Sequence, residues 1–257
     1  MKSQIKIFEA NKKDGVMSRN KIFYNDELTQ DEINEIFKQT RIKLGKKYGF
    51  NGLKMIQAVQ KTDLNKVEYP DGKYINITEK ELTKDDYWYL NLEADILMIS
   101  NKYKGIVIGN MCADCPIVIA EDRKKGVTAL AHCGAAYINK KLPSQIIESL
   151  QKEYKSNVDD IYVYISSGAK KENFIYDTYP HWSTNKEVWK DCIEKTNNKY
   201  RIDMYKAILK QLDDKQIKNI KVSKNDTITN IDYASHYCRI RGDEKKSGQN
   251  FVGFYYI

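Results

Sequence analysis

Three short hydrophobic runs near the middle of the chain dominate its pattern of apolar and polar positions. Ile106–Gly109, Pro116–Ala120 and Val127–Ala131 are rich in β-branched residues and are bounded by glycine, aspartate or lysine. Such runs are typical of buried strands with tight connections. The pattern predicts three adjacent strands, with a polar turn at Glu121–Gly126 that joins the second strand to the third.

The rest of the chain shows alternating helical and strand patterns. A helix is expected at Asp26–Tyr48, with a capping box formed by Thr29 and Glu32, and another at Leu142–Tyr154, entered through Pro143. The other predicted elements are strands at Ile5–Phe8, Leu53–Val59 and Ile217–Val222, a helix at Ile202–Leu212 and a surface loop at Tyr69–Tyr87. These patterns predict an α/β (α+β) fold with a mixed β-sheet core flanked by helices.

Composition favours one compact domain over residues 1–257. The chain has only four prolines, no linker rich in serine or glycine, and no internal repeat. No apolar run approaches the roughly 18 residues of a membrane helix, and the first residues lack the core of a signal peptide. Five cysteines at irregular spacing do not resemble a disulfide framework. We therefore expect a cytoplasmic protein with reduced thiols that does not act at a membrane.

The net charge of +8 raises the question of a nucleic-acid partner. Lysine supplies nearly all of the positive charge and is scattered among acidic residues, whereas phosphate-reading surfaces favour clustered arginine. We therefore expect no nucleic-acid binding. A positive field still attracts small anionic substrates such as phosphate.

Two potentially reactive side chains, Cys115 and His132, flank the predicted hairpin. The pair suits a nucleophile with its base, or two ligands of a catalytic zinc ion. Cys112 and Cys115 also have the spacing of a redox dithiol. The remaining alternative is a buried thiol beside a hydrogen-bonded structural histidine. The spacing of these residues does not choose among the four.

Two segments around this pair resemble motifs of a known family. NMCADCPIVIAED, from Asn110, resembles "T-A-D-C-x-P-V-L", and ALAHCGAAY, from Ala129, resembles "V-H-A-G-W". Near the end, Tyr237–Arg241 and Ser247–Asn250 resemble "F-S-Y-R-R…T-G-R", with Gln249 in place of the last arginine. The motifs and their order are similar to those of the laccase-domain (polyphenol oxidoreductase, YfiH-type) family, regarded as purine nucleoside phosphorylases.

The resemblance implies a zinc site made of Cys115, His132 and an upstream histidine. Gln60 stands at the position of that histidine, and an amide carbonyl is a much poorer zinc ligand than an imidazole. His236 or His181 is then the candidate replacement, and we expect zinc to be weakly held. Copper is not expected, because three histidines are too few for multicopper chemistry.

The implied activity is phosphorolysis of adenosine, inosine or guanosine, with adenosine deamination as an additional reaction. Cys115 and His132 would be the catalytic and metal-binding residues, and Asp114 would orient a ligand. Arg239 and Arg241, expected on a terminal strand, would bind phosphate. Gln60 and His236 would complete the substrate site. The expected partners are therefore small molecules, a nucleoside and phosphate.

Two further hypotheses stay open. Without metal, Cys115 and His132 would form the nucleophile and base of an amide hydrolase or a peptidoglycan-precursor editing enzyme. Alternatively, loss of the third ligand would mark a non-catalytic protein that only binds nucleosides. Alkylation of the thiol tests the first hypothesis, and thermal stabilisation by purines without turnover supports the second.

We predict that protein purified without added zinc carries clearly less than stoichiometric zinc, because Cys115 and His132 alone bind it weakly. Gln60→His should raise the zinc content, since it restores the His/Cys/His set that the resemblance implies. Elemental analysis of both proteins measures the difference. Stoichiometric zinc in the unmodified protein would reveal a replacement ligand, and His236→Ala and His181→Ala would identify it.

Overall fold

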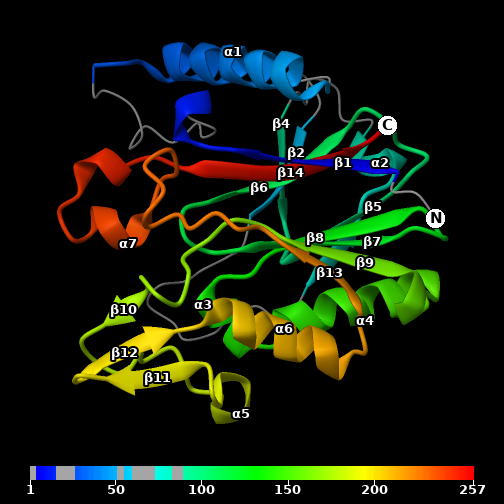
Figure 1. The fold of residues 1–257 in the computed structure, drawn as a ribbon. Helices are drawn as coiled ribbons and strands as arrows, with labels where there is room; N and C mark the ends of the chain where they lie inside the picture. The colour runs from blue at the N-terminus through cyan, green and yellow to red at the C-terminus, as the bar shows by residue number, and fades with distance from the viewer. Residues whose placement is uncertain (1–3, 16–26, 51–54, 60–72, 83–88) are drawn as a thin grey trace.

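Two mixed β-sheets lie face to face at the centre of the protein, and helices cover their outer faces (Figure 1). The computed structural model describes residues 4–15, 27–50, 55–59, 73–82 and 89–257. The mixed α/β fold class predicted from the sequence is confirmed.

The sheets contain both parallel and antiparallel neighbours. In spatial order the first sheet consists of β1 (Ile5–Ala10), β14 (Asn250–Tyr256), β6 (Val107–Cys112), β2 (Met55–Val59) and β4 (Tyr89–Glu93). The second consists of β13 (Asn219–Val222), β9 (Ile161–Ile165), β7 (Ile117–Asp122), β8 (Val127–His132), β5 (Ile96–Ser100) and β3 (Tyr74–Asn76). A small third sheet consists of β10 (Ile175–Tyr176), β12 (Lys199–Ile202) and β11 (Ile193–Thr196).

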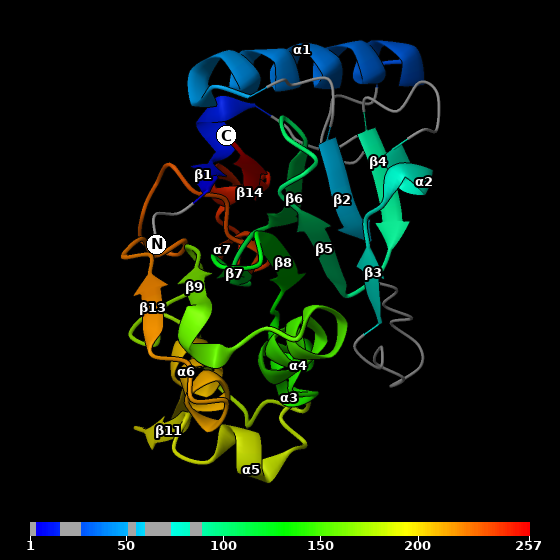
Figure 2. The same cartoon turned by 90° about the vertical axis from the view of Figure 1, so that its right-hand side faces the viewer.

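The described helices differ in length and in their position around the two large sheets. They are α1 (Gln30–Tyr48), α2 (Glu79–Leu82), α3 (Ala135–Asn139), α4 (Leu142–Tyr154), α5 (Lys186–Trp189), α6 (Met204–Asp214) and α7 (His236–Arg239). Figure 2 shows α1 on the outer side of the first sheet and α3, α4 and α6 on the outer side of the second. The described chain thus forms four layers in the order helix, sheet, sheet, helices.

The side chains of strand β7 contribute to two hydrophobic cores, one on each face of its sheet. Ile117 and Ile119 face the first sheet, while Val118 and Ala120 pack toward the helices on the other side. Because successive side chains of a strand point to opposite faces, a strand buried on both sides is apolar throughout. This explains why the central runs lack polar alternation.

Helix α1 confirms the prediction made from its capping box. Thr29 accepts a hydrogen bond from the Glu32 backbone, and the Glu32 carboxylate accepts one from the Thr29 backbone. Phe37 and Leu44 are buried against the first sheet. Helix α4 likewise begins with Pro143 in its first turn, as predicted.

The prediction of three adjacent central strands is wrong in one respect. β7 and β8 form the expected hairpin, but β6 belongs to the other sheet, where it pairs with β14 and β2. The chain crosses from one sheet to the other at residues 113–116. An apolar run reveals burial on both faces but does not identify the neighbouring strand, so the sequence pattern missed this crossing.

The predicted surface loop at Tyr69–Tyr87 also needs correction where the structure describes it. Strand β3 and helix α2 lie within this range, and β3 pairs in parallel with β5. Ile77, just after β3, is buried in the core between the sheets. β3 has only three residues and lies among polar ones. A run this short shows no clear apolar pattern, so the sequence did not predict the strand.

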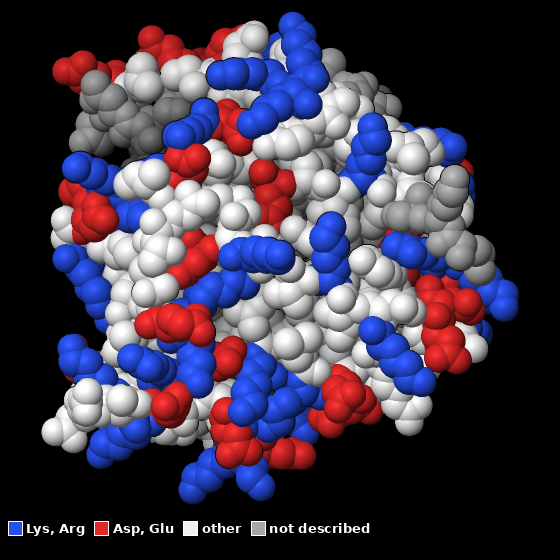
Figure 3. All heavy atoms as spheres, in the orientation of Figure 1, with Lys and Arg blue, Asp and Glu red and all other residues white. Residues whose placement is uncertain are grey.

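Charged side chains are intermixed on the face of the molecule that Figure 3 shows. Among the residues drawn in colour there, blue lysine and arginine side chains lie between red acidic ones and form no continuous stripe. Within the described chain, every helix is too short or too polar to cross a membrane. The expectation of no nucleic-acid partner remains a prediction.

A close approach between β6 and β14 generates a stability prediction. Gly109 lies opposite Gly253, and a Cβ atom on Gly109 would be 2.2 Å from Cζ of Phe251 and 2.8 Å from the Val252 carbonyl oxygen. We predict that Gly109→Ala lowers the free energy of unfolding by about 1–3 kcal/mol, because an overpacked core must distort. Urea denaturation measures this change.

A double-mutant cycle provides the control for that prediction. Phe251→Leu removes the ring that covers Gly109, so the double variant should lose less stability than the sum of the two single variants. Strictly additive losses would contradict the proposed contact between the ring and the new methyl group.

Candidate functional site

A cavity of about 350 Å³ opens where the chain crosses between the two large sheets. Its lining combines residues of that crossing, the ends of β8 and β10, helix α7 and the start of α6. The lining residues are Met111, Cys112, Ala113, Asp114, Cys115, His132, Ala135, Phe174, Tyr176, Met204, His236, Tyr237, Ile240 and Gln249. Asp114, Cys115, His132 and His236 of the predicted site thus share one cavity with Gln249 of the closing motif.

Cys115 and His132 converge at one end of the β7–β8 hairpin. Cys115 lies in the crossing, and His132 ends β8, where it stands opposite Ile117. A Cβ atom placed on Gly134 would be 2.9 Å from the Cys115 sulfur and 3.9 Å from Nε2 of His132. Both side chains therefore lie in front of Gly134, and the hairpin brings them together as the sequence predicts.

Burial perturbs the acid–base chemistry of this pair. Loss of solvent raises the pKa of the Cys115 thiol to about 12, an effect that the Asp114 charge increases and a hydrogen bond from the Ala135 backbone partly offsets. Loss of solvent also lowers the pKa of His132 to about 4. At neutral pH the metal-free pair is a neutral thiol beside a neutral imidazole. This state disfavours the activated thiolate that a cysteine hydrolase needs.

Asp114 ties the crossing to the C-terminal part of the chain. Its carboxylate accepts hydrogen bonds from the Thr227 hydroxyl at 2.8 Å and from the Tyr237 backbone amide at 2.7 Å. Its backbone carbonyl accepts a third bond, from the amide of Ala169 at 2.9 Å. These contacts fix α7 over the cavity. The proposed role of Asp114 in orienting a metal ligand stays a prediction.

The predicted phosphate-binding residues lie at the rim of the cavity. Arg239 ends α7, and Arg241 lies in the turn after it. The prediction that both arginines lie on a terminal strand is therefore wrong. The Ser235 side chain accepts a hydrogen bond from the Cys238 amide and caps this short helix. Such a cap favours helix over strand at residues that otherwise have mixed propensities.

The arginines of this rim contact residues that line the cavity. Nη2 of Arg239 is 3.2 Å from Nδ1 of His236. Because a guanidinium only donates, Nδ1 accepts and the imidazole proton lies on Nε2. The Arg241 guanidinium lies 3.6 Å from the centre of the Tyr237 ring. Both arginines are exposed, and neither lines the cavity itself.

An aromatic wall is the feature of the site that sequence patterns did not reveal. Phe174, Tyr176 and Tyr237 meet edge to face, with ring centres 5.2–6.0 Å apart. Tyr179 and His181, which lie close to Tyr176 in the sequence, are exposed and lie outside the cavity lining. Aromatic residues are frequent throughout this region, so composition did not distinguish the three that converge.

Gln249 is the second unforeseen member of the site. Its Oε1 atom is buried and has no hydrogen-bond partner within the described part of the chain. The motif comparison noted this residue only because it replaces an arginine. An unpaired buried carbonyl near an apolar cavity is a candidate contact for a ligand that carries an N–H or O–H group.

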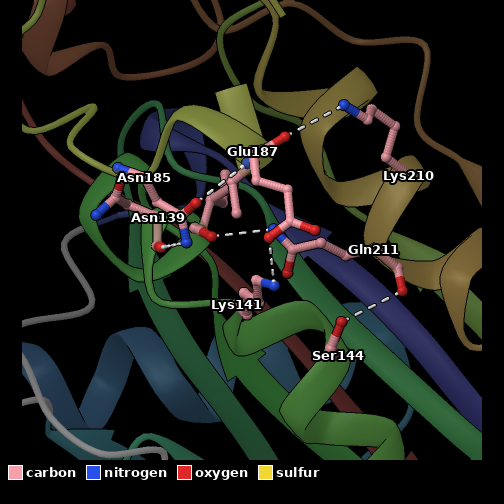
Figure 4. A network of polar contacts seen from close by, with 9 residues as sticks. Asn139, Lys141, Ser144, Asn185, Glu187, Lys210 and Gln211 are labelled. Carbon is pink, nitrogen blue, oxygen red and sulfur yellow. Dashed lines mark hydrogen bonds and ion pairs between the residues drawn. The ribbon is translucent and has the colours of Figure 1, made fainter. Parts of the chain in front are cut away.

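The floor of the cavity is supported by a polar network around α3, which begins shortly after His132 (Figure 4). The Asn139 side-chain oxygen accepts hydrogen bonds from the Asn185 amide at 2.8 Å and from Nε1 of Trp189 at 3.0 Å. Gln211 of α6 donates to the Ile138 carbonyl at 2.9 Å. These buried bonds hold α3 against α5 and α6, and so stabilise the backbone next to His132.

The described residues do not fit a complete zinc or copper site. Cys115 and His132 supply two suitable ligands, but no cluster of three histidine, cysteine or acidic residues able to hold a metal occurs in the part of the chain that the structure describes. Gln60, which stands at the predicted position of the third metal ligand, lies outside the described residues. A catalytic zinc ordinarily has three protein ligands, so no catalytic step is assigned to a metal here.

Sequence comparison identifies the family. Residues 10–254 match the family described as multi-copper polyphenol oxidoreductase laccase. The chain belongs to this laccase family. The resemblance inferred from the cysteine and histidine motifs is thereby confirmed. The family's name refers to copper, whereas the described donor set of this member does not make a copper centre.

This laccase-family protein is also similar over part of its length to a curated relative. It is 26% identical, over 174 residues, to a purine nucleoside phosphorylase of Clostridium acetobutylicum. The match covers 62% of this chain and 66% of that protein, which is slightly less than two thirds of its length.

Solved structures of low sequence identity share the fold. The hypothetical protein YfiH of Bacillus licheniformis has a TM-score of 0.71 at 15% identity, covering 87% of this chain and 82% of its own. YlmD of Geobacillus stearothermophilus has a TM-score of 0.69 at 16% identity, covering 86% and 80% respectively. These likenesses establish a shared fold.

The perturbed thiol leads to a pH prediction. In metal-free protein, iodoacetamide should alkylate Cys115 very slowly at pH 7, because the pKa near 12 leaves almost no thiolate. The rate should rise about tenfold per pH unit between pH 7 and 10, since the thiolate fraction does. Peptide mapping by mass spectrometry separates Cys115 from the other cysteines, and Cys115→Ser identifies its peptide. Fast alkylation with a plateau above pH 6 would instead show an imidazolium-stabilised thiolate.

Proposed function

We propose that this protein is a purine nucleoside phosphorylase. Phosphate would attack C1′ of the ribose and release the free base with ribose 1-phosphate. The observation that carries the proposal is one cavity that joins the Cys115–His132 pair to an aromatic wall and a cationic rim. The name of the clostridial relative supports the same reaction class.

The cavity has the size and polarity expected for a nucleoside. Its volume of about 350 Å³ lies in the range of small-molecule sites, which combine apolar walls with a few polar groups. The rings of Phe174 and Tyr237 provide a surface on which a flat purine can pack. Ribose would then lie near Cys115 and His132.

His132 and Cys115 can each form a hydrogen bond to the substrates in this arrangement. The neutral imidazole of His132 can accept a hydrogen bond from a ribose hydroxyl or from the attacking phosphate. The neutral thiol of Cys115 is a weak donor to the sugar. Neither role requires charge on a buried side chain, in agreement with the direction of both pKa shifts.

The rim supplies the positive charge that phosphate needs. Arg239 and Arg241 are exposed beside the cavity and retain N–H groups beyond those that bond His236 and the Tyr237 carbonyl. Guanidinium groups bind phosphate through paired hydrogen bonds. The net charge of +8 adds long-range attraction for the anion.

The proposal predicts phosphate-dependent release of base. Purified protein incubated with inosine, guanosine or adenosine should release hypoxanthine, guanine or adenine only when phosphate is present. Chromatography of the products measures this, and it also detects inosine formed from adenosine by deamination. Failure to release any of the three bases under phosphate would refute the proposed function.

Histidine variants give a matched test of the site. His132→Ala should lower kcat/KM at least about a hundredfold, the scale of losing a positioned catalytic group. His181→Ala should leave activity unchanged, because His181 is exposed and lies outside the cavity lining. Equal loss in both variants would show that the activity does not arise at this cavity.

A further inference from the structure

We propose that Tyr176 is a catalytic residue that donates a hydrogen bond from its hydroxyl to the departing purine. The ring nitrogen that accepts this bond would be N7. The inference rests on the proposed phosphorolysis and adds the group that stabilises the leaving base. It is argued from the packing of the Tyr176 ring, the pairing of the other polar groups and the charge that the reaction creates.

The Tyr176 ring is held on several sides. Its centre lies 5.2 Å from that of Phe174, 6.0 Å from that of Tyr237 and 6.3 Å from that of Trp182. The Arg241 guanidinium stands 5.6 Å from the ring centre. The backbone of Tyr176 also pairs with Tyr200 in the small sheet. These contacts fix the ring while leaving the hydroxyl for another partner.

Among the residues that the structure describes, none is a hydrogen-bond partner of the Tyr176 hydroxyl, and Tyr176 lines the cavity. The neighbouring Tyr237 differs, because its hydroxyl donates to the Ile175 carbonyl at 2.5 Å. Both carboxylate oxygens of Asp114 accept bonds from the protein, and Nδ1 of His236 is paired with Arg239. Tyr176 is therefore a phenol available to a ligand beside groups that are already engaged.

The phenol carries its proton at neutral pH. Burial raises the pKa of Tyr176 to about 12, although the positive charge of Arg241 acts in the opposite direction. The negative charge of Asp114 adds to the increase. A phenol in this state donates a hydrogen bond and keeps its proton.

The reaction places negative charge on the departing purine, and a hydrogen-bond donor such as the Tyr176 hydroxyl stabilises that charge. As a phosphate oxygen forms its bond to C1′, the C1′–N9 bond breaks and its electron pair moves onto the base. The charge spreads over the imidazole ring of the purine to N7, where the Tyr176 hydroxyl would stabilise it. The proton lost by the attacking phosphate oxygen ends on the free base through solvent, so tyrosine is unchanged and the step balances.

Tyr176→Phe tests this inference, because it removes the hydroxyl and keeps the ring. With guanosine and phosphate, kcat should fall about ten- to a hundredfold with little change in KM, the loss expected for a hydrogen bond to developing charge. With 7-methylguanosine, kcat should change by less than about twofold, because N7 is already methylated and accepts no bond. The thermal midpoint should stay the same, since the substitution removes no hydrogen bond to another described residue.

Tyr179→Phe is the matched control, because Tyr179 is exposed and absent from the cavity lining. Its activity should equal that of the unmodified protein. Equal losses of Tyr176→Phe on both nucleosides, or a rise in KM with kcat intact, would overturn the inference. If the unmodified protein does not use 7-methylguanosine as a substrate, the test rests on guanosine alone. A fall in kcat with unchanged KM then supports the role of Tyr176, and any other result contradicts it.

The same assays separate the two levels of the proposal. An unmodified protein that releases no base contradicts the proposed function, and the role of Tyr176 falls with it. An active protein whose Tyr176→Phe variant is equally active contradicts only the role of Tyr176.

Discussion

The carboxylate of Asp114 is the contact on which the geometry of the candidate site depends. It joins the crossing between the two sheets to Thr227 and to the first turn of α7. Hydrogen bonds to a charged group contribute about 1.5–3 kcal/mol each, and a buried carboxylate that lost them would be strongly destabilising. Cys115 follows Asp114 directly, so the same contact fixes one wall of the cavity relative to the other.

The cavity separates three kinds of chemistry within a small space. Its floor carries a neutral thiol and a neutral imidazole, its wall is aromatic, and its positive charge is confined to the exposed rim. Buried charge is costly unless it is paired, whereas a guanidinium that stacks on a ring can remain hydrated. Arg241 over Tyr237 has that geometry. A neutral sugar and base can therefore enter the interior while an anionic co-substrate remains at the edge.

Sequence patterns predicted what depends on nearby residues and missed what depends on distant ones. The capping box of α1 and the hairpin that joins Cys115 to His132 are local, and both were predictable. The bond between Asp114 and Tyr237 spans 123 positions and has no local signature. For the same reason, the aromatic wall and the placement of β6 in the first sheet appeared only in the structure.

The position of β14 constrains how this protein can be made. This strand lies between β1 and β6, although β1 and β6 both precede it by more than a hundred residues. Until a ribosome has synthesised β14, β1 has no partner among the described strands and one side of β6 lacks its described neighbour. Contacts so distant in sequence slow folding, and open strand edges promote aggregation. The nascent chain therefore spends most of its synthesis with an incomplete first sheet, whose open strand edges are exposed to wrong pairing until β14 is made.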